Sequence, residues 1–215
     1  MSPAFAPSRR SAGFVNPTEP SSVPFRSLRT AVDLGTKRDG GTALMFTSTH
    51  PREGTSTMAS NHALLASSTG RSTLLIDANL SRPVLHTRLG EDRRPGLVDV
   101  AAGGIGFEEA IRRTSVGQVE LSLLPAGSPV HGTVDVLSSE GTADILSAAC
   151  RLFDLVIIDT PPILTLPDAA VVSAHREVDT VVVVGRRQRR SRATRTITEL
   201  RRAGANVIGV VVNTR

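Results

Sequence analysis

The sequence predicts a doubly wound α/β domain with a mainly parallel β-sheet, on two observations. Runs of Val, Ile and Leu without polar alternation recur along the chain, as in "LVIID" and "TVVVVG", and such runs are typical of strands buried on both faces of a parallel sheet. Helical segments separate these runs, and helices in that position form the right-handed crossovers between parallel strands. Ligands bind such domains at the carboxyl ends of the strands, so a functional site is expected there.

The predicted elements follow one another from about residue 25. Phe25, Leu28 and Val32 have helical spacing and indicate a first helix over residues 25–35. Two longer helices are expected over residues 55–70 and 191–204, the second ending in a glycine, which is favoured just after helices. Strands are expected at residues 42–48, 72–79, 119–127, 152–160, 178–185 and 205–213.

Length and composition fit one domain. The 215 residues are 40% hydrophobic and 21% charged, and no apolar run is long enough to cross a bilayer. Residues 1–24 are rich in Pro and Ser and lack the apolar core of a signal peptide. We therefore expect a flexible N-terminal arm at 1–24 and a single domain at 25–215. A cytoplasmic location is expected, with peripheral attachment to the inner face of the plasma membrane left open.

The basic residues are almost all arginines. Lys37 is the only lysine, the net charge is +5, and arginines cluster in residues 186–195, "RRQRRSRATR". An anionic membrane surface and a solvated helix face both fit this arginine run. The chain has no Trp, no Tyr and six Phe, which disfavours binding of single-stranded nucleic acid. The single cysteine, Cys150, leaves no disulfide and no cysteine-based metal site.

Residues 45–57, "MFTSTHPREGTST", read as the end of a strand, a turn of small residues and the start of a helix. A phosphate-binding loop has this context and the pattern G-x-x-x-x-G-K-[ST]. Gly54 and the hydroxyls of Ser56 and Thr57 fit the pattern, but Thr55 stands where the lysine is expected. The sequence therefore predicts a phosphate site built on helix N-terminal amides without its usual lysine.

Two acidic residues end predicted strands near this loop. Asp77 ends "LLID" and Asp159 ends "LVIID". Mg²⁺ prefers oxygen ligands, so carboxylates beside a loop with paired hydroxyls favour a Mg-nucleotide, either Mg-ATP or Mg-ADP. One such Asp is weak evidence because Asp is common at strand ends and helix caps. The loop with its paired hydroxyls, Asp77 and Asp159 occur in successive α/β units, and together they make binding of a Mg-nucleotide the stronger interpretation.

Six segments between about Phe25 and Asn213 form a recognisable set: "FRSLRT", "TSTHPREGTST", "LLIDANLSRPVLH", "RPGLVDVAAG", "LLPAG" and "VIIDTPPILTLPDAAVVS". Together they resemble a known family, the bacterial tyrosine kinases (BY-kinases) of capsule and exopolysaccharide assembly. This family is a branch of the ParA and MinD group of P-loop ATPases. The last segment is the most specific, and with Arg82, Pro83 and His86 it separates this branch from the ParA and MinD proteins.

The resemblance implies roles for the matching residues. Gly54 and the amides after it would wrap the β-phosphate, and Ser56 would bind Mg²⁺. Asp77 and Asp159 would be the catalytic residues that hold the metal and its waters. The implied nucleotide-binding residues are Arg52, Glu53, Gly54, Thr55, Ser56, Thr57 and Asn213, the last contacting adenine, and the implied metal ligands are Ser56, Asp77 and Asp159. The implied partner is a membrane-anchored polysaccharide co-polymerase.

The chain departs from the family pattern at several positions. Thr55 replaces the phosphate-binding lysine, Arg52 replaces a glycine, and His50 stands where ParA and MinD proteins have a second lysine. The acidic pattern Asp-x-Asp-x-Arg keeps only its first member, Asp77. The helix used for ring assembly has Val23 in place of its glutamate, although both arginines remain, so self-association is left open. With no tyrosine in the chain, autophosphorylation on tyrosine is excluded by composition.

The missing lysine and the missing acidic residue should lower nucleotide affinity and the rate of phosphoryl transfer by different factors. Losing one charge-assisted hydrogen bond to phosphate weakens binding by roughly ten- to a hundredfold. Phosphoryl transfer suffers more, by about 10²–10³ for one preorganised donor. Arg52 could replace the lysine charge, although Arg and Lys interchange poorly. The leading hypothesis is a degenerate, pseudokinase-like regulatory partner in polysaccharide biosynthesis with weak or no ATP turnover. The alternatives are an active kinase that phosphorylates tyrosines of other proteins and a ParA- or MinD-like positioning ATPase that uses the arginine run on DNA.

Overall fold

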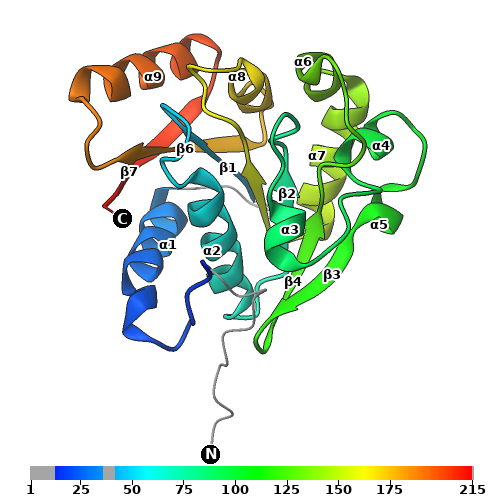
Figure 1. The fold of residues 1–215 in the computed structure, drawn as a ribbon, viewed down its shortest axis with the longest axis horizontal. Helices are drawn as coiled ribbons and strands as arrows, with labels where there is room; N and C mark the ends of the chain where they lie inside the picture. Colours follow the sequence, from blue (N-terminus) through cyan, green and yellow to red (C-terminus); the bar gives the residue numbers. More distant parts are fainter. Residues whose placement is uncertain (1–12, 36–41, 215) are drawn as a thin grey trace, which may run out of the picture.

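The computed structural model describes residues 13–35 and 42–214, and a seven-stranded sheet forms its centre (Figure 1). The strand order is β3-β4-β2-β5-β1-β6-β7. All neighbouring strands are parallel except β3 and β4, which form an antiparallel pair at one edge. The strands are β1 (Thr42–Ser48), β2 (Thr73–Asp77), β3 (Arg112–Val116), β4 (Val119–Leu124), β5 (Leu155–Asp159), β6 (Val178–Gly185) and β7 (Asn206–Asn213).

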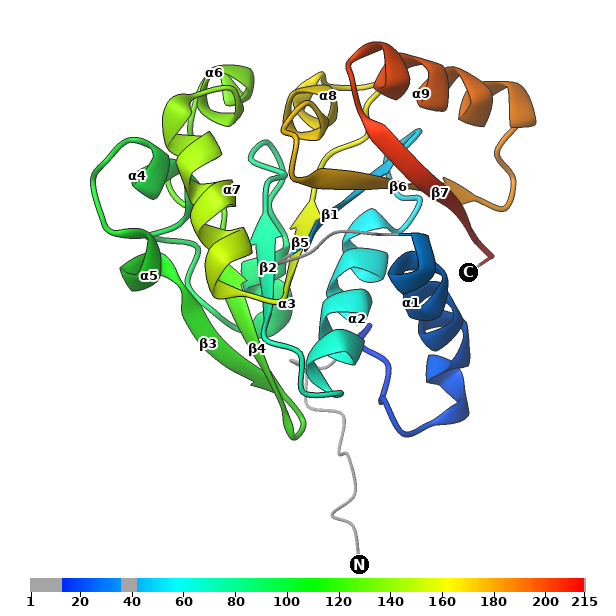
Figure 2. The ribbon, with the colours of Figure 1, turned by 180° about the vertical axis from the view of Figure 1, so that it is seen from behind.

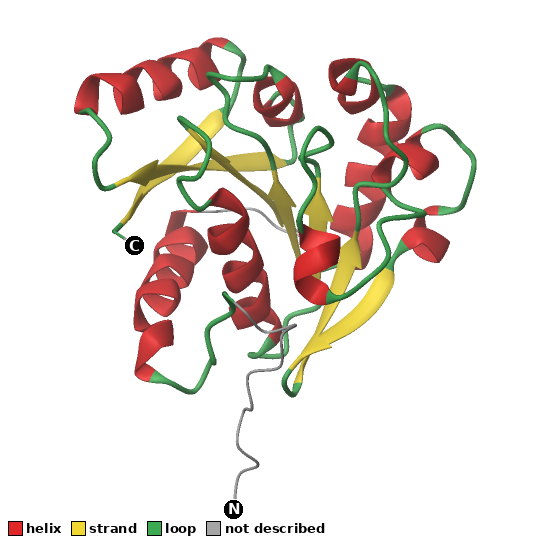
Figure 3. Cartoon of the chain, viewed as in Figure 1, coloured by secondary structure: helices red, strands yellow, loops and turns green. Residues whose placement is uncertain are grey.

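Helices cover both faces of the sheet, so the described chain has three layers (Figures 2 and 3). Helices α1 to α3 cover one face, and helices α4 to α9 cover the other. The helices are η2 (Pro20–Ser22, a 3₁₀ turn), α1 (Val23–Gly35), α2 (Thr55–Ser67), α3 (Leu85–Leu89), α4 (Leu97–Ala101), α5 (Phe107–Ala110), α6 (Thr133–Leu137), α7 (Glu140–Leu152), α8 (Asp168–Ser173) and α9 (Arg190–Arg202). None of them is long and apolar enough to cross a membrane.

The predicted doubly wound, mainly parallel architecture is confirmed. Strands β1, β2 and β5 are buried along their whole length, as their unbroken apolar runs indicated. Strand β3 was not predicted, because its sequence "RRTSV" is polar and alternates between half-buried and exposed positions. This pattern is typical of an edge strand with one face toward water.

The register of the central strands brings the predicted site residues together. Strand β5 lies between β1 and β2, and Asp77 of β2 pairs directly with Asp159 of β5. The loop after β1 leaves the same carboxyl edge of the sheet, because all three strands are parallel. Two carboxylates and the loop that leads to α2 therefore meet at one edge.

Residues 13–16 form an N-terminal strap that packs on α2. Phe14 and Val15 are buried, at 9% and 6% exposure. The Asn61 side chain of α2 accepts a hydrogen bond from the Val15 amide at 2.7 Å and donates one to the Gly13 carbonyl at 2.9 Å. The described part of the predicted arm is thus attached to the domain. Residues 1–12 of that arm, and Lys37, lie outside the described residues, and the boundary at residue 24 stays a prediction.

His62 of α2 is a buried histidine that carries no charge at neutral pH. Its side chain is completely buried, neither ring nitrogen has a hydrogen-bond partner among the described residues, and the ring lies 5.5 Å from that of Phe46. Burial, followed by the positive charges of Arg71 and Arg29, lowers the pKa of His62 to about 3. A lowered folded-state pKa means that stability present above pH 6.5 is lost as the pH falls toward 3.

The substitution His62→Leu should therefore stabilise the protein. It removes two unpaired buried polar atoms, which should raise the free energy of unfolding by about 1–2 kcal/mol at pH 7. It also removes the histidine's acid-dependent loss, so its advantage over the parent should grow as the pH falls from 7 to 5. Urea unfolding at both pH values measures this. An advantage that stays constant with pH would show that His62 does not titrate as its burial requires.

Candidate functional site

The loop between β1 and α2 is held in shape by Glu53. Its Oε2 accepts hydrogen bonds from the amides of Thr49 at 2.9 Å and His50 at 3.0 Å, and its Oε1 accepts one from Gln188 Nε2 at 3.0 Å. Glu53 is only 9% exposed. The carboxylate of this predicted nucleotide-binding residue therefore accepts hydrogen bonds from the loop itself and from the turn after β6.

Gly54 is required by its backbone and by its neighbour. Its φ of 93° lies in the left-handed region, which favours glycine. A Cβ at this position would lie 2.3 Å from Nδ2 of Asn213, whose amide donates to the Glu53 carbonyl at 3.0 Å. Asn213 therefore anchors the loop from the end of β7. Its predicted contact with adenine stays a prediction.

Arg52 has a strained backbone for its residue type. It is the single non-glycine residue with positive φ among residues 13–35 and 42–214, at 68°. The left-handed conformation costs a residue with a Cβ about 1–2 kcal/mol, which gives a physical reason for the glycine that the family pattern has here. Its side chain is exposed at the outer part of the loop.

Helix α2 begins at Thr55, directly after the loop. Gly54 is its N-cap residue, and no side chain caps the first turn, so the first amides of this 13-residue helix keep donors for an anion. Thr55 is 9% exposed and uncharged. Ser56 and Thr57 follow in the same turn and are half-buried.

Asp159 is the least satisfied group of the site. It is completely buried, and neither carboxylate oxygen accepts a hydrogen bond of ordinary geometry from the described residues. Burial, and then the negative charge of Asp77, raise its pKa well above the usual range, while the nearby Ser56 hydroxyl and the Arg88 guanidinium lower it. A buried carboxylate without partners beside a hydroxyl and a second carboxylate fits a divalent cation bound through oxygen.

Asp77 is also buried but has partners. Its Oδ2 accepts hydrogen bonds from the amides of Val84 at 3.1 Å and Leu85 at 3.0 Å, and its Oδ1 accepts one from the Asn79 amide at 3.3 Å. Burial raises the pKa of Asp77 to about 6, against the lowering effect of these hydrogen bonds. Asp77 therefore fixes the start of α3. Its roles as metal ligand and catalytic residue stay predictions.

Arg88 is a site residue that the motifs did not indicate. It lies on α3, beside α2 (Figure 1), and its Nη1 and Nη2 both donate to Thr57 Oγ1 at 3.1 Å. Its Cζ lies 5.7 Å from the centre of the Phe14 ring. No sequence signal marks this arginine, because its place depends on α3 and on the N-terminal strap.

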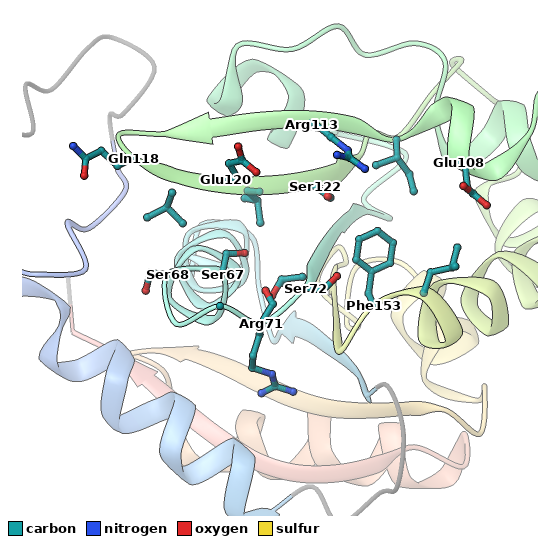
Figure 4. A pocket seen from close by; sticks show the side chains of 16 residues that line it. Ser67, Ser68, Arg71, Ser72, Glu108, Arg113, Gln118, Glu120, Ser122 and Phe153 are labelled. Atoms are coloured by element: carbon teal, nitrogen blue, oxygen red, sulfur yellow. The ribbon is translucent and has the colours of Figure 1, made fainter.

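A separate groove of about 680 Å³ lies at the other end of α2 (Figure 4). Its lining carries both signs of charge, with Arg71 and Arg113 beside Glu108 and Glu120. It contains none of the predicted site residues. The phosphate-type loop therefore stands as the candidate functional site.

Solved structures share the fold of this chain. The septum site-determining protein MinD of Pyrococcus horikoshii, solved with Mg-ADP, matches with a TM-score of 0.65 and 22% identity, over 80% of this chain and 70% of that chain. The kinase domain of the Escherichia coli tyrosine kinase ETK matches with a TM-score of 0.88 and 25% identity, over 99% of this chain and 82% of that chain. The domain therefore has the P-loop NTPase fold.

The sequence relatives are proteins named as bacterial tyrosine-protein kinases. The putative tyrosine-protein kinase EpsB of Ralstonia solanacearum is 32% identical over 197 residues, which are 92% of this chain and 26% of that protein. The tyrosine-protein kinase YwqD of Bacillus subtilis is 28% identical over 209 residues, 96% of this chain and 87% of that protein. No protein-family model matches. The chain is a homologue of the bacterial tyrosine-protein kinases, as its motifs indicated, and it spans about a quarter of the length of EpsB.

Proposed function

We propose that this domain is a degenerate tyrosine-kinase-like protein that acts as a cytoplasmic regulatory partner in exopolysaccharide or capsule biosynthesis. It binds Mg-ADP or Mg-ATP weakly and turns ATP over slowly or not at all. The observation that carries the proposal is Thr55, an uncharged residue in the lysine position of a loop whose shape is otherwise kept by Glu53, Gly54 and Asn213. A relative from Klebsiella pneumoniae, 26% identical, is named as a putative tyrosine-protein kinase in the cps region.

The residues present fit a Mg-nucleotide. Asp159 is buried and accepts no hydrogen bond of ordinary geometry from the described residues, and it would hold the cation together with the Ser56 hydroxyl. Asp77 would add negative charge. The free amides at the start of α2 would bind phosphate oxygens. When bound, Mg²⁺ supplies positive charge to those oxygens. This chain's own residues orient the phosphates and keep the Asp159 carboxylate away from water.

Turnover should be slow because two charges of the family site are missing. Phosphoryl transfer depends almost entirely on positioning and charge stabilisation. Thr55 supplies no cation, and Asn79 supplies no carboxylate. Asn79 Oδ1 instead accepts a hydrogen bond from the Arg82 amide at 3.3 Å, within the turn before α3. Without tyrosine in its 215 residues, the chain also offers no tyrosine acceptor for its own phosphorylation.

The arginine run, residues 186–195, lies next to the loop. Its arginines are exposed, and Arg192 Nη1 lies 3.3 Å from His50 Nε2 in the loop. A positive surface beside the site suits an acidic cytoplasmic tail of a membrane-anchored polysaccharide co-polymerase, or the anionic membrane surface around it. The proposed partner therefore docks close to the nucleotide loop.

The proposal is tested by binding to vesicles that carry such a co-polymerase with its cytoplasmic tail. We expect binding that does not change when ATP is added, and no phosphate transfer to tyrosine peptides. Rapid ATP-dependent phosphorylation of the co-polymerase tail would instead support the alternative of a kinase that acts on other proteins. Salt-sensitive binding to duplex DNA would support the positioning ATPase. Failure to bind any co-polymerase would contradict the regulatory role.

A further inference from the structure

We propose that Arg88 provides the positive charge that the loop lacks at Thr55, by contacting the phosphates of a bound Mg-nucleotide. This inference rests on the nucleotide binding proposed above and deepens it. It assigns the phosphate contact to a residue outside the loop, on α3. Arg88 is thereby a binding residue, and its target is the phosphate group of a nucleoside di- or triphosphate.

The guanidinium lies at the start of α2, where phosphates would be bound. Nη1 and Nη2 both donate to Thr57 Oγ1 at 3.1 Å, and Thr57 is two residues after Thr55 in the same helical turn. Burial lowers the pKa of Arg88, and the Asp159 carboxylate lies close enough to offset part of that effect. The Arg88 side chain is thus near both the phosphate amides and the predicted metal carboxylate.

Arg88 has donors left for an anion. A guanidinium carries five N–H donors, and among the described residues only the Thr57 hydroxyl accepts from it. No carboxylate of the described chain lies within salt-bridge distance, 4.0 Å, of its nitrogens. A half-buried cation without an ion-pair partner is unfavourable, and a bound phosphate would compensate it. Arg pairs with phosphate in fixed, often bidentate geometry.

The surroundings hold Arg88 in this position. The Phe14 ring packs 5.7 Å from its Cζ, and a Cβ at Gly13 would come within 2.7 Å of Nη2. The strap that carries both residues is fixed to α2 by Asn61. Asp77 caps the start of α3. Such a preorganised cation loses little conformational entropy when it binds an anion.

Two other arginines near the loop are weaker candidates. Arg52 is exposed and has the strained φ of 68°. Arg192 is exposed and lies beside His50. Neither side chain is packed by an aromatic ring among the described residues. Arg192 serves as the matched control for the loss of one positive charge, and Arg52→Ala tests the alternative that Arg52 supplies the phosphate charge.

Calorimetric titration with Mg-ADP tests the inference on the parent chain, Arg88→Met, Arg52→Ala and Arg192→Ala. We expect Arg88→Met to weaken binding by about tenfold or more, with a change of less than about threefold in the control Arg192→Ala. A larger loss in Arg52→Ala than in Arg88→Met would assign the phosphate contact to Arg52 and contradict the inference. Circular dichroism checks that each variant is folded. Parent-like affinity of a folded Arg88→Met would overturn the inference while leaving the proposed nucleotide site in place.

A double-mutant cycle separates a phosphate contact from a structural role. If Arg88 and a lysine at position 55 serve the same phosphate charge, Thr55→Lys should raise affinity more in Arg88→Met than in the parent. If Arg88 only supports Thr57, the gain should be equal in both backgrounds, and the inference fails. A silent parent with a binding Thr55→Lys variant also overturns it. If no variant binds, Thr55→Lys included, the proposed nucleotide binding fails as well.

Discussion

Asp159→Asn should make the nucleotide-free protein more stable at neutral pH and abolish its stabilisation by Mg-ADP. Asp159 is fully buried, accepts no hydrogen bond of ordinary geometry from the described residues and lies in register with Asp77. Its ionised form is therefore unfavourable in the folded state. Asparagine has a similar shape and no charge, so we expect a gain on the order of 1–3 kcal/mol in the free energy of unfolding, or roughly 2–4 °C per kcal/mol in melting temperature.

The stability advantage of Asp159→Asn should depend on pH, in a direction that follows from the raised pKa of Asp159. The folded-state pKa of Asp159 is raised above 3.8, so its contribution to stability is present below pH 3.8 and is lost as the pH rises through the raised value. The advantage of Asp159→Asn should accordingly shrink toward zero as the pH is lowered to about 4. Thermal unfolding at pH 7.5 and pH 4, with and without Mg-ADP, measures both effects. A variant that is less stable than the parent at pH 7.5 would contradict the assignment.

Asp99 offers a control of opposite sign. Burial raises the pKa of Asp99, but hydrogen bonds from the Ser128 hydroxyl and from the Gly96 and Ser128 amides outweigh it, so its pKa is lowered. Its stabilising contribution is present at neutral pH and is lost as the pH falls through the lowered value. Asp99→Asn should therefore destabilise the protein at pH 7.5, in contrast to Asp159→Asn.

The contrast between Asp99 and Asp159 supports the assignment of the loop and its carboxylates as a ligand-binding site. Asp99 accepts hydrogen bonds within the fold, whereas Asp159 is buried and accepts no hydrogen bond of ordinary geometry from the described residues. Natural proteins retain such costs mainly where a ligand compensates them. The same argument applies to Arg88, a half-buried cation without an ion-pair partner among the described residues.

The fold could be predicted from sequence because its central strands are buried on both faces. Their apolar runs, such as Leu155–Asp159, have no alternative interpretation as half-exposed strands. The edge strand β3 could not be predicted from its apolar pattern, since "RRTSV" carries two arginines and pairs only on one side. The short helices α3 to α6 likewise lack the length that makes helical periodicity readable.

The sequence predicted those site residues that a local feature marks, such as a backbone conformation or a position at the end of a strand. Gly54 is marked by its positive φ and by the close approach of Asn213, and Asp159 by its place after a buried strand. Arg88 and the role of Glu53 depend instead on tertiary contacts. Arg88 contacts Thr57 of α2 because Asp77 fixes the start of α3 and the strap of residues 13–16 packs beside the guanidinium, and local sequence does not encode this arrangement.

Thr55→Lys should restore nucleotide affinity without restoring turnover. The loop that would receive the lysine is already shaped by Glu53, Gly54 and Asn213, so little reorganisation is required. An ammonium group at the start of α2 would add a charge-assisted hydrogen bond to phosphate, and we expect a gain of roughly ten- to a hundredfold in Mg-ADP affinity. A lysine far from the phosphate site should not raise the affinity in this way, because salt screens long-range attraction. Ser68→Lys, exposed at the far end of α2, adds the same charge and should leave affinity within about twofold.

Turnover in Thr55→Lys should stay low because the second acidic residue is still missing at Asn79. Removing one preorganised group typically costs about 10²–10³ in rate, and a restored lysine does not replace a carboxylate. The double variant Thr55→Lys with Asn79→Asp should hydrolyse ATP at least about tenfold faster than Thr55→Lys alone. Phosphate release from Mg-ATP under single-turnover conditions measures the difference. Equal rates in the two variants would show that Asn79 does not limit the chemistry.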